Sequence, residues 1–286
     1  MRSFITTCVS TLLLFSVVGA LEITPLQQEL FSHLQMSEEY IQAFPIDHYE
    51  ICSVKGRGSF YIDKPEDLIK GFLARGEPWE EMYEKLLKTY AKPGTIVLDI
   101  GAHIGTHTLT LSKAVGKEGR VIAFEPQRKI HRELCMNLRL NNRSNVIPLF
   151  TALGSRNTER IMSPVPEGNE GMRKIVEGYN GHTEGCETVF VRRLDDFAFK
   201  NVSFIKMDTE GYEDAVLEGA RNTIKACHPV LFVEIQGGEA KTPEKKRVQA
   251  EKTKRTVEKL KSMGYTVSRI RWQDFLAIPK KRAKRK

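Results

Sequence analysis

A glycine-containing loop and one acidic residue downstream of it are the strongest chemical signals in this sequence. The loop has the sequence DIGAHIG at positions 99–105. Gly101 and Gly105 permit a tight turn and let backbone N–H groups approach a ligand closely. Glu125 follows 26 positions after Asp99 and ends the next apolar run, where an acid in a nucleotide-binding sheet accepts hydrogen bonds from both ribose hydroxyls. Loop and acid together predict a nucleoside site, whereas the loop alone also fits a tight turn without a ligand.

The loop pattern favours S-adenosylmethionine over a dinucleotide as the nucleoside cofactor. A dinucleotide loop has the pattern G-x-G-x-x-G, whose glycines let the pyrophosphate approach, but His103 and Thr106 stand at two of the relevant positions. S-adenosylmethionine has no phosphate and carries a positive sulfonium, so Asp99 would favour its charged amino-acid end directly or through water. For His103 we expect a loop residue with an unusual backbone geometry rather than a base or a ligand.

A second group of polar residues has the sequence KMDTEGYE at positions 206–213 and lies at the end of another apolar run. Alternation along a strand places Lys206 and Asp208 on one side, while Asp208 and Glu210 reach the loop beyond it. Transfer of a methyl group to an acceptor group whose pKa is far above 7 needs a base that removes the proton. Asp208 or Glu210 is our candidate for this base, with a pKa raised by burial and by neighbouring acids.

Two further roles for these carboxylates stay open. In one, Asp208 or Thr209 caps the following helix, and a structural role at the helix start is the interpretation we prefer for Glu213. In the other, Asp208, Glu210 and Glu234 hold Mg²⁺, which would orient and acidify the substrate hydroxyl. Glu234 joins them because it ends the next apolar run at the same edge.

Short apolar runs alternate with helical patterns over the part of the chain that carries these residues. The predicted strands are residues 95–100, 120–125, 145–150, 204–208 and 230–234. Repeated strand–helix units predict an α/β fold with a doubly wound, mostly parallel sheet, whose ligands bind at the carboxyl ends of the strands. Residues 21–90 predict a mainly helical lead-in, and residues 155–188, which have no clear period, predict an irregular surface segment. We expect substrate contacts from these two segments.

Five motifs make the sequence resemble the FkbM-type family of S-adenosylmethionine-dependent methyltransferases over residues 75–279. They are VLDIGAHIG at 97–105, AFEP at 123–126, FIKMDTEGYEDAVLEGA at 204–220, PVLFVEI at 229–235 and DFLAIP at 274–279. The resemblance implies a class I, Rossmann-like methyltransferase fold. It also implies O-methylation of sugars, polyketides or other small hydroxyl compounds, so the expected partner is a small-molecule or glycan hydroxyl.

Carried over onto the matching positions, the resemblance implies a division of the site into two parts. The residues that would line the cofactor are Asp99, Gly101, His103, Gly105 and Glu125, and those at the reaction edge are Asp208 and Glu210. The sequence departs from the family at His103, where Asn is usual. Both side chains are polar, so the departure leaves the expected cofactor unchanged.

Residues 1–20 have the composition of a secretory signal peptide. Arg2 precedes an apolar run at 4–18, and small residues precede a cleavage point after Ala20. Uncleaved, the segment 4–21 is just long enough to anchor the chain in a bilayer, and we expect no other membrane contact. Both alternatives place the body in the periplasm, in the secretory pathway or outside the cell. The expected boundaries are 1–20 for this segment, 21–90 for the lead-in, 91–279 for the methyltransferase domain and 280–286 for a basic tail.

The net charge of +8 is concentrated in residues 241–261 and 280–286. One alternative function is therefore a nucleic-acid methyltransferase that uses the 241–261 stretch, although no aromatic-rich base-stacking motif follows the fourth strand, so nucleic acid is the less expected partner. Another alternative is a noncatalytic nucleoside-binding module, in which the acids only cap a helix. Four cysteines permit disulfides in an exported chain and equally fit free thiols: Cys52, Cys135, Cys186 and Cys227.

Overall fold

The computed structural model describes residues 24–176, 184–235 and 242–280. The predicted signal peptide or anchor lies outside these ranges, as do residues 281–286 of the predicted basic tail. Within the described ranges, no helix is long and apolar enough to cross a membrane. The cysteines of the described part are free thiols: Cys52, Cys135, Cys186 and Cys227.

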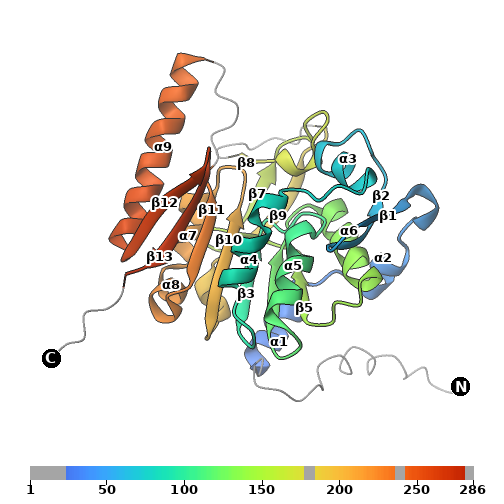
Figure 1. Ribbon diagram of the computed structural model, residues 1–286, viewed down its shortest axis with the longest axis horizontal. Coiled ribbons are helices and arrows are strands. Elements are labelled where there is room, and N and C mark those ends of the chain that lie inside the picture. Colours follow the sequence, from blue (N-terminus) through green and yellow to red (C-terminus); the bar gives the residue numbers. More distant parts are fainter. Residues whose placement is uncertain (1–23, 177–183, 236–241, 281–286) are drawn as a thin grey trace, which may run out of the picture.

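A seven-stranded sheet forms the centre of the molecule (Figure 1). Its strand order is β12-β13-β11-β10-β3-β4-β5, and β13 runs opposite to the other six strands. The strands are β3 (Ile96–Ile100), β4 (Arg120–Phe124), β5 (Val146–Leu149), β10 (Val202–Asp208), β11 (Val230–Glu234), β12 (Tyr265–Arg271) and β13 (Asp274–Pro279). The five predicted strands coincide with β3, β4, β5, β10 and β11, so the predicted α/β fold with a mostly parallel sheet is confirmed.

Two hydrophobic cores lie on opposite faces of this sheet. Along β3, Leu98 and Ile100 enter one core and Val97 enters the other, because successive side chains of a strand point to opposite faces. The helices over the first core are α1 (Pro25–Leu34), α7 (Glu213–Gly219), α8 (Arg221–Cys227) and α9 (Pro243–Ser262), and those over the second are α4 (Glu84–Tyr90), α5 (Thr106–Val115) and α6 (Arg128–Leu140). Burial on both faces explains why the strands are continuous apolar runs in the sequence.

The lead-in wraps around the sheet and contributes to both cores. Besides α1 and α4 it contains α2 (Glu38–Gln42), η1 (Ile46–His48), β1 (Glu50–Val54), β2 (Gly58–Ile62), α3 (Leu68–Ala74) and η2 (Glu81–Tyr83). Phe31 of α1 lies 6.1 Å from Phe197 between ring centroids in the first core. Leu87 of α4 is fully buried in the second core. The lead-in therefore folds together with the sheet, and its later part reaches the carboxyl ends of the strands.

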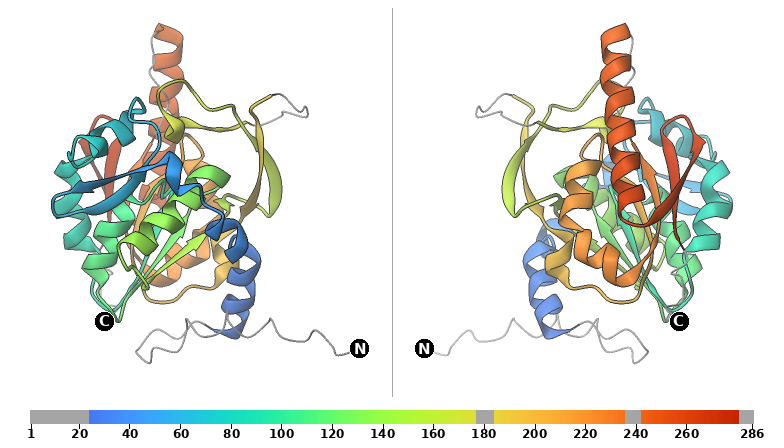
Figure 2. Two further views of the ribbon diagram at one scale, coloured as in Figure 1. Left: turned by 90° about the vertical axis from the view of Figure 1, so that its right-hand side faces the viewer. Right: turned by 90° about the vertical axis from the view of Figure 1, so that its left-hand side faces the viewer.

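The described part of residues 155–188 is more regular than its sequence predicts. A four-stranded sheet has the order β6-β9-β7-β8 and contains β6 (Ala152–Leu153), β7 (Thr158–Met162), β8 (Ile175–Val176) and β9 (Glu187–Arg192). The short helix η3 (Glu170–Met172) precedes β8, and η4 (Leu194–Phe197) follows β9. The prediction of an irregular segment was thus wrong for β7, β8 and the start of β9, because these strands are only partly buried and lack the continuous apolar run that marks the strands of the central sheet. Figure 2 shows this small sheet projecting beside the central one.

Candidate functional site

A cavity of about 260 Å³ lies at the carboxyl ends of β3, β4, β10 and β11. The predicted site residues in its wall are Gly101, His103, Glu125, Asp208, Glu210 and Glu234. Residues from the two segments expected to bind substrate also line the cavity, among them Ile69 of α3, Glu80 before η2 and Met172 of η3. Asp99 and Gly105 are not part of the wall and lie behind it.

The loop between β3 and α5 approaches β10 so closely that position 101 must be glycine. Gly101 has a φ of 77°, and a Cβ atom there would lie 1.8 Å from the carbonyl oxygen of Asp208. His103 has a φ of 50°, which confirms the unusual backbone geometry predicted for it. Both ring nitrogens of His103 are buried without a hydrogen-bond partner among the described residues. Burial lowers the pKa of His103 to about 3, so the ring is neutral near pH 7.

Glu125 holds the same loop from the end of β4. Its Oε2 accepts a hydrogen bond from the backbone N–H of His103 at 2.9 Å, and its Oε1 accepts one from the backbone N–H of Gln127 at 2.9 Å. Burial raises the pKa of Glu125 to about 7, and the two backbone hydrogen bonds limit this rise. Each carboxylate oxygen has a second lone pair, so Glu125 can still accept hydrogen bonds from hydroxyl groups.

Lys206 and Asp99 tie the loop to β10. Lys206 Nζ donates a hydrogen bond to the Gly101 carbonyl oxygen at 2.8 Å and lies 3.6 Å from Asp99 Oδ1. Asp99 is fully buried, and its Oδ2 accepts a hydrogen bond from Thr108 Oγ1 at 2.6 Å. Burial acts to lower the pKa of Lys206, but the surrounding acids outweigh it and raise the pKa above its ordinary value. The site therefore contains a buried positive charge next to its acids.

Three further acids gather at the ends of β10 and β11. Asp208 Oδ2 lies 3.8 Å from Lys206 Nζ, while Asp208 Oδ1 is buried without a hydrogen-bond partner in the described part of the chain. Burial raises the pKa of Asp208. Glu234 stands beside Asp208 on one side and Asp274 on the other, and burial together with their charges raises its pKa to about 9. Glu210, in the loop after β10, adds to this effect.

Four residues of this edge were not identified as site residues from the sequence. Tyr83 of η2 donates a hydrogen bond to Asp274, whose pKa burial raises to about 6. Glu80 lies 2.8 Å from Nε2 of His107. Burial acts to raise the pKa of Glu80, but the hydrogen bond and charge of His107 outweigh it, so the pKa lies below its ordinary value. The one available signal was that Asp274 begins the last of the five motifs.

Glu213 accepts hydrogen bonds from the residues that lead into α7. Its Oε1 accepts a hydrogen bond from the backbone N–H of Gly211 at 2.8 Å and one from Thr209 Oγ1 at 3.1 Å. The cap position of α7 is Tyr212, so neither Asp208 nor Thr209 caps this helix. The structural role preferred for Glu213 is confirmed, and the capping alternative for Asp208 is wrong because its carboxylate faces the cavity.

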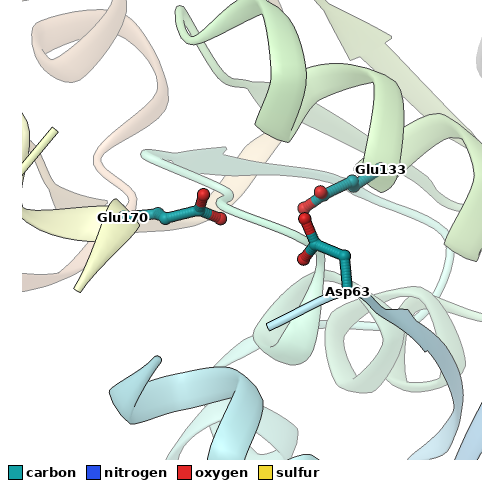
Figure 3. A group of neighbouring side chains, drawn as sticks. All are labelled: Asp63, Glu133 and Glu170. Carbon is teal, nitrogen blue, oxygen red and sulfur yellow. The ribbon is translucent and has the colours of Figure 1, made fainter. Parts of the chain in front are cut away.

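A second acidic group lies next to the cavity and consists of Asp63, Glu133 and Glu170. Figure 3 shows their carboxylates turned toward one another, and one oxygen of each lies within 4.8 Å of the others. Lys70 Nζ fills this position, at 2.5 Å from Asp63, 3.0 Å from Glu133 and 2.6 Å from Glu170. Lys129 adds a second ammonium group at 2.7 Å from Glu170. These five residues, here named the lysine clamp, join η3 to α6 and to the end of β2.

The fold and the site define a class I, Rossmann-like methyltransferase. Numbered along the chain within the central sheet, its strands have the order 3-2-1-4-5-7-6, with the last strand antiparallel and helices on both faces. The nucleoside-type loop follows the first strand, at the point where the strand order reverses. The chain belongs to the FkbM methyltransferase family, because the family model described as Methyltransferase FkbM domain matches residues 99–267. The resemblance seen in the sequence is thereby confirmed.

Several solved structures are similar to this chain at low sequence identity. Methyltransferase FkbM from Methylobacillus flagellatus KT is 19% identical, with a TM-score of 0.42, and the match covers 88% of this chain but 58% of that one. A putative rRNA-methylase from Clostridium thermocellum is 15% identical, with a TM-score of 0.46 and coverage of 68% and 91%. Aeropyrum pernix fibrillarin with bound S-adenosyl-L-methionine is 15% identical, with a TM-score of 0.41 and coverage of 83% and 86%. No curated protein matches the chain.

Proposed function

We propose that this protein is an S-adenosylmethionine-dependent O-methyltransferase whose acceptor is a hydroxyl of a small molecule or glycan. The observation that supports this most strongly is that Glu125 and Asp208 line one cavity. Glu125 suits the ribose of a nucleoside, and the partly exposed Asp208 carboxylate has one buried oxygen that is unpartnered among the described residues. Membership in a methyltransferase family supplies the class of reaction.

The cavity wall fits S-adenosylmethionine better than a phosphate-bearing nucleotide. Glu80, Asp208 and Glu210 line the cavity, and the pKa of Glu80 lies below its ordinary value, so the wall carries negative charge that favours a cationic ligand over a phosphate. Glu125 would accept hydrogen bonds from the ribose hydroxyls, and the two unpartnered ring nitrogens of His103 offer one donor and one acceptor. Asp99 would act from behind the loop, through Lys206. When bound, the cofactor supplies a methyl group on a positively charged sulfur.

Asp208 is the proposed general base. Its Oδ1 would accept the proton of the acceptor hydroxyl while the hydroxyl oxygen bonds to the methyl carbon and the carbon–sulfur bond breaks. Burial raises the pKa of Asp208, which makes it a stronger base than an exposed carboxylate. Lys206, at 3.8 Å, favours the ionised form and thus keeps the base available near neutral pH. Glu210 lies on the same wall and is the second candidate for this role.

We further propose that Mg²⁺ is not required at Asp208, Glu210 and Glu234. Lys206 already brings a positive charge to this edge, and these three carboxylates do not converge as a ligand group within the described residues. Addition of a chelator to the purified enzyme is therefore expected to leave turnover unchanged. A loss of turnover that Mg²⁺ restores would instead support the metal-assisted reaction.

Calorimetric titration of the full chain with S-adenosylmethionine, with NAD as a control ligand, tests the proposal. We expect binding of the methyl donor alone, and a loss of roughly 10- to 100-fold in affinity for Glu125→Ala, because hydrogen bonds to a charged group contribute about 1.5–3 kcal/mol. Glu159→Ala, on the exposed part of β7, is the matched control and should bind normally. Absence of S-adenosylmethionine binding in a folded sample would contradict the proposed function.

Two alternatives predict different results in the same assays. A noncatalytic module would bind S-adenosylmethionine and transfer no methyl group to any hydroxyl acceptor. A nucleic-acid methyltransferase would bind RNA or DNA through α9 with a steep salt dependence. Part of the basic surface of α9 is already paired within the protein, since Lys252 contacts Glu213 and Arg255 contacts Asp214. We also propose export directed by residues 1–20, which N-terminal sequencing of the mature protein would test.

A further inference from the structure

Glu80 is an acid of the cavity wall that comes from the lead-in and not from the end of a strand. It directly precedes η2 and has a φ of 48°, in the left-handed region that residues other than glycine seldom adopt. Backbone strain of this kind persists where the surrounding structure holds a residue in place, and it gathers at functional sites. The proposed reaction relies on Glu125, Asp208 and Lys206. Glu80 is therefore a strained acid in the wall that this reaction does not use.

The first turn of α5 holds the Glu80 carboxylate by one oxygen. Oε2 of Glu80 lies 2.8 Å from Nε2 of His107, while Oε1 receives no hydrogen bond from the described part of the chain. The side chain keeps 27% of its surface exposed, so a ligand in the cavity can reach it. Burial acts to raise the pKa of Glu80, but the hydrogen bond and charge of His107 outweigh it and hold the pKa below its ordinary value. Glu80 is thus an ionised carboxylate with one oxygen open to a cation.

Glu80 and Glu125 lie at different parts of the sheet edge. Glu125 follows β4. The charge of Glu80 instead raises the pKa of the acids that end β10 and β11 and begin β13, which places it near that part of the edge. In the strand order β13-β11-β10-β3-β4, β3 separates these strands from β4. A nucleoside whose ribose binds Glu125 therefore has Glu80 on the far side of the same cavity.

The acid that the sequence suggests for the charged amino-acid end of S-adenosylmethionine does not reach this cavity. Asp99 is fully buried behind the wall, where its Oδ2 accepts a hydrogen bond from Thr108 and its Oδ1 lies 3.6 Å from Lys206 Nζ. The residue before Thr108 in α5, His107, instead pairs with Glu80, which does line the cavity. Glu80 thus supplies, inside the cavity, the negative charge that was expected from Asp99.

We propose that Glu80 binds the ammonium group at the amino-acid end of S-adenosylmethionine. The inference rests on the proposed function and assigns a residue outside the matched family domain to the cofactor. An ammonium group has three N–H donors, and its hydrogen bond to an ionised carboxylate is among the strong ones. The carboxylate of the same amino-acid end suits the start of α5, where Gly105 provides no capping side chain. Two acids from different parts of the edge, Glu125 and Glu80, then hold the two ends of one ligand.

Calorimetric titration of Glu80→Gln with three adenosine ligands tests the proposal. S-adenosylmethionine has the ammonium group and a positive sulfur, S-adenosylhomocysteine has the ammonium group and a neutral sulfur, and 5′-methylthioadenosine has a neutral sulfur and no amino-acid end. We expect losses in affinity of about 10-fold or more for the first two ligands, because a hydrogen bond between charged groups is weakened. The affinity for 5′-methylthioadenosine should stay unchanged.

Two control variants separate this effect from general damage to the site. Glu81→Gln changes the exposed neighbour of Glu80 and should bind all three ligands as the parent does. Glu125→Ala should weaken all three, because each of them has the ribose. The Gln side chain at position 80 can still pair with His107. Partial unfolding would not imitate the expected result either, because it leaves the ratio of the affinities for S-adenosylhomocysteine and 5′-methylthioadenosine unchanged.

The other outcomes of the titration overturn the proposal in different ways. A loss for S-adenosylmethionine alone would place Glu80 at the sulfur and not at the ammonium group. Equal losses for all three ligands would show that Glu80 only shapes the cavity, and three unchanged affinities would show that it does not contact the cofactor. If the parent protein binds S-adenosylmethionine in none of these titrations, the proposed function fails, and the role of Glu80 fails with it.

Discussion

The lysine clamp and the acids at the sheet edge are two buried carboxylate groups on either side of one cavity. In the clamp, two ammonium groups contact three carboxylates, and their charges hold the pKa values of Asp63 and Glu170 below the ordinary range despite burial, whereas burial raises the pKa of the fully buried Glu133. At the edge, one ammonium group, Lys206, lies near Asp208, and burial dominates. The pKa of Glu234 accordingly rises to about 9.

This difference distinguishes carboxylates that stay ionised and crosslink the fold from carboxylates that can bind a proton near neutral pH. Where enough cations are in contact, a buried carboxylate stays ionised and crosslinks the elements around it. Where cations are scarce, burial favours the protonated form, and the group can exchange a proton near neutral pH. We infer that the clamp fixes η3 over the cavity and that the edge acids do the chemistry there.

The largest expected effect concerns the edge. Asp208→Asn should lower kcat by about 10²- to 10⁴-fold, the usual contribution of a general base, and should not lower stability, because burial disfavours the charge that it removes. Initial rates of S-adenosylhomocysteine formation and a thermal melt would measure both quantities. Asp63→Asn in the clamp is the matched control, with the opposite result: reduced stability and kcat within a few-fold of the parent. Full activity in the Asp208 variant would assign the base elsewhere, with Glu210 as the next candidate.

The clamp should respond most strongly to loss of its central cation. Lys70 is fully buried, so Lys70→Met leaves three acids facing one another and should cost about 3–5 kcal/mol of unfolding free energy. Denaturation in urea would measure this change. Lys88→Met removes an ion pair with Glu84 from the surface of α4 and should cost no more than about 1 kcal/mol. Similar losses in the two variants would mean that the clamp is not a special feature of the fold.

The two groups should also give opposite pH dependences of stability. Because the folded pKa of Glu234 is raised from 4.5 to about 9, its folded form keeps a proton that the unfolded chain releases, so stability falls as pH rises between these values. The slope is at most about 1.4 kcal/mol per pH unit, and Glu234→Gln should flatten it. The pKa of Glu170 is lowered, so its contribution is present above the ordinary pKa of 4.5 and is lost as pH falls below it. Urea midpoints measured across pH 3–9 for Glu234→Gln and Glu170→Gln would separate the two slopes. A common slope would contradict the comparison.

The smallest expected effect comes from the outer cation of the clamp. Lys129 is 43% exposed, and solvent screens its contacts with Asp63 and Glu170. Lys129→Met should therefore cost about 1 kcal/mol or less, well below the loss for Lys70→Met. A cost as large as that for Lys70 would show that both ammonium groups are needed to keep the clamp ionised.

The sequence predicted the elements whose pattern is local. Strands buried on both faces are short continuous apolar runs, and five of them were placed within two residues of their observed bounds. The loop after β3 was recognisable because Gly101 leaves no room for a Cβ atom and His103 adopts a left-handed backbone. Glu125 was found because it ends a strand next to that loop in the sheet.

Other site residues depend on contacts between distant parts of the chain. Glu80 meets His107 from the lead-in, and Tyr83 meets Asp274 across most of the sequence. Neither pair can be recognised from the spacing of its residues in the sequence, because each residue would also be unremarkable at its own position without the partner. The clamp is similar, since Lys70 and Glu170 are a hundred positions apart.

By itself, the sequence determined the family and the succession along the chain of the strands and helices that build most of the central sheet. It also determined the residues at the ends of these strands. Both follow from the hydrophobic pattern and from backbone positions that only certain residues allow. Only the tertiary structure decided which acids bind a proton and which segments of the chain cover the cavity. A pKa depends on burial and on the charges within a few ångströms, and here those neighbours come from segments far apart in the chain, which only folding brings together.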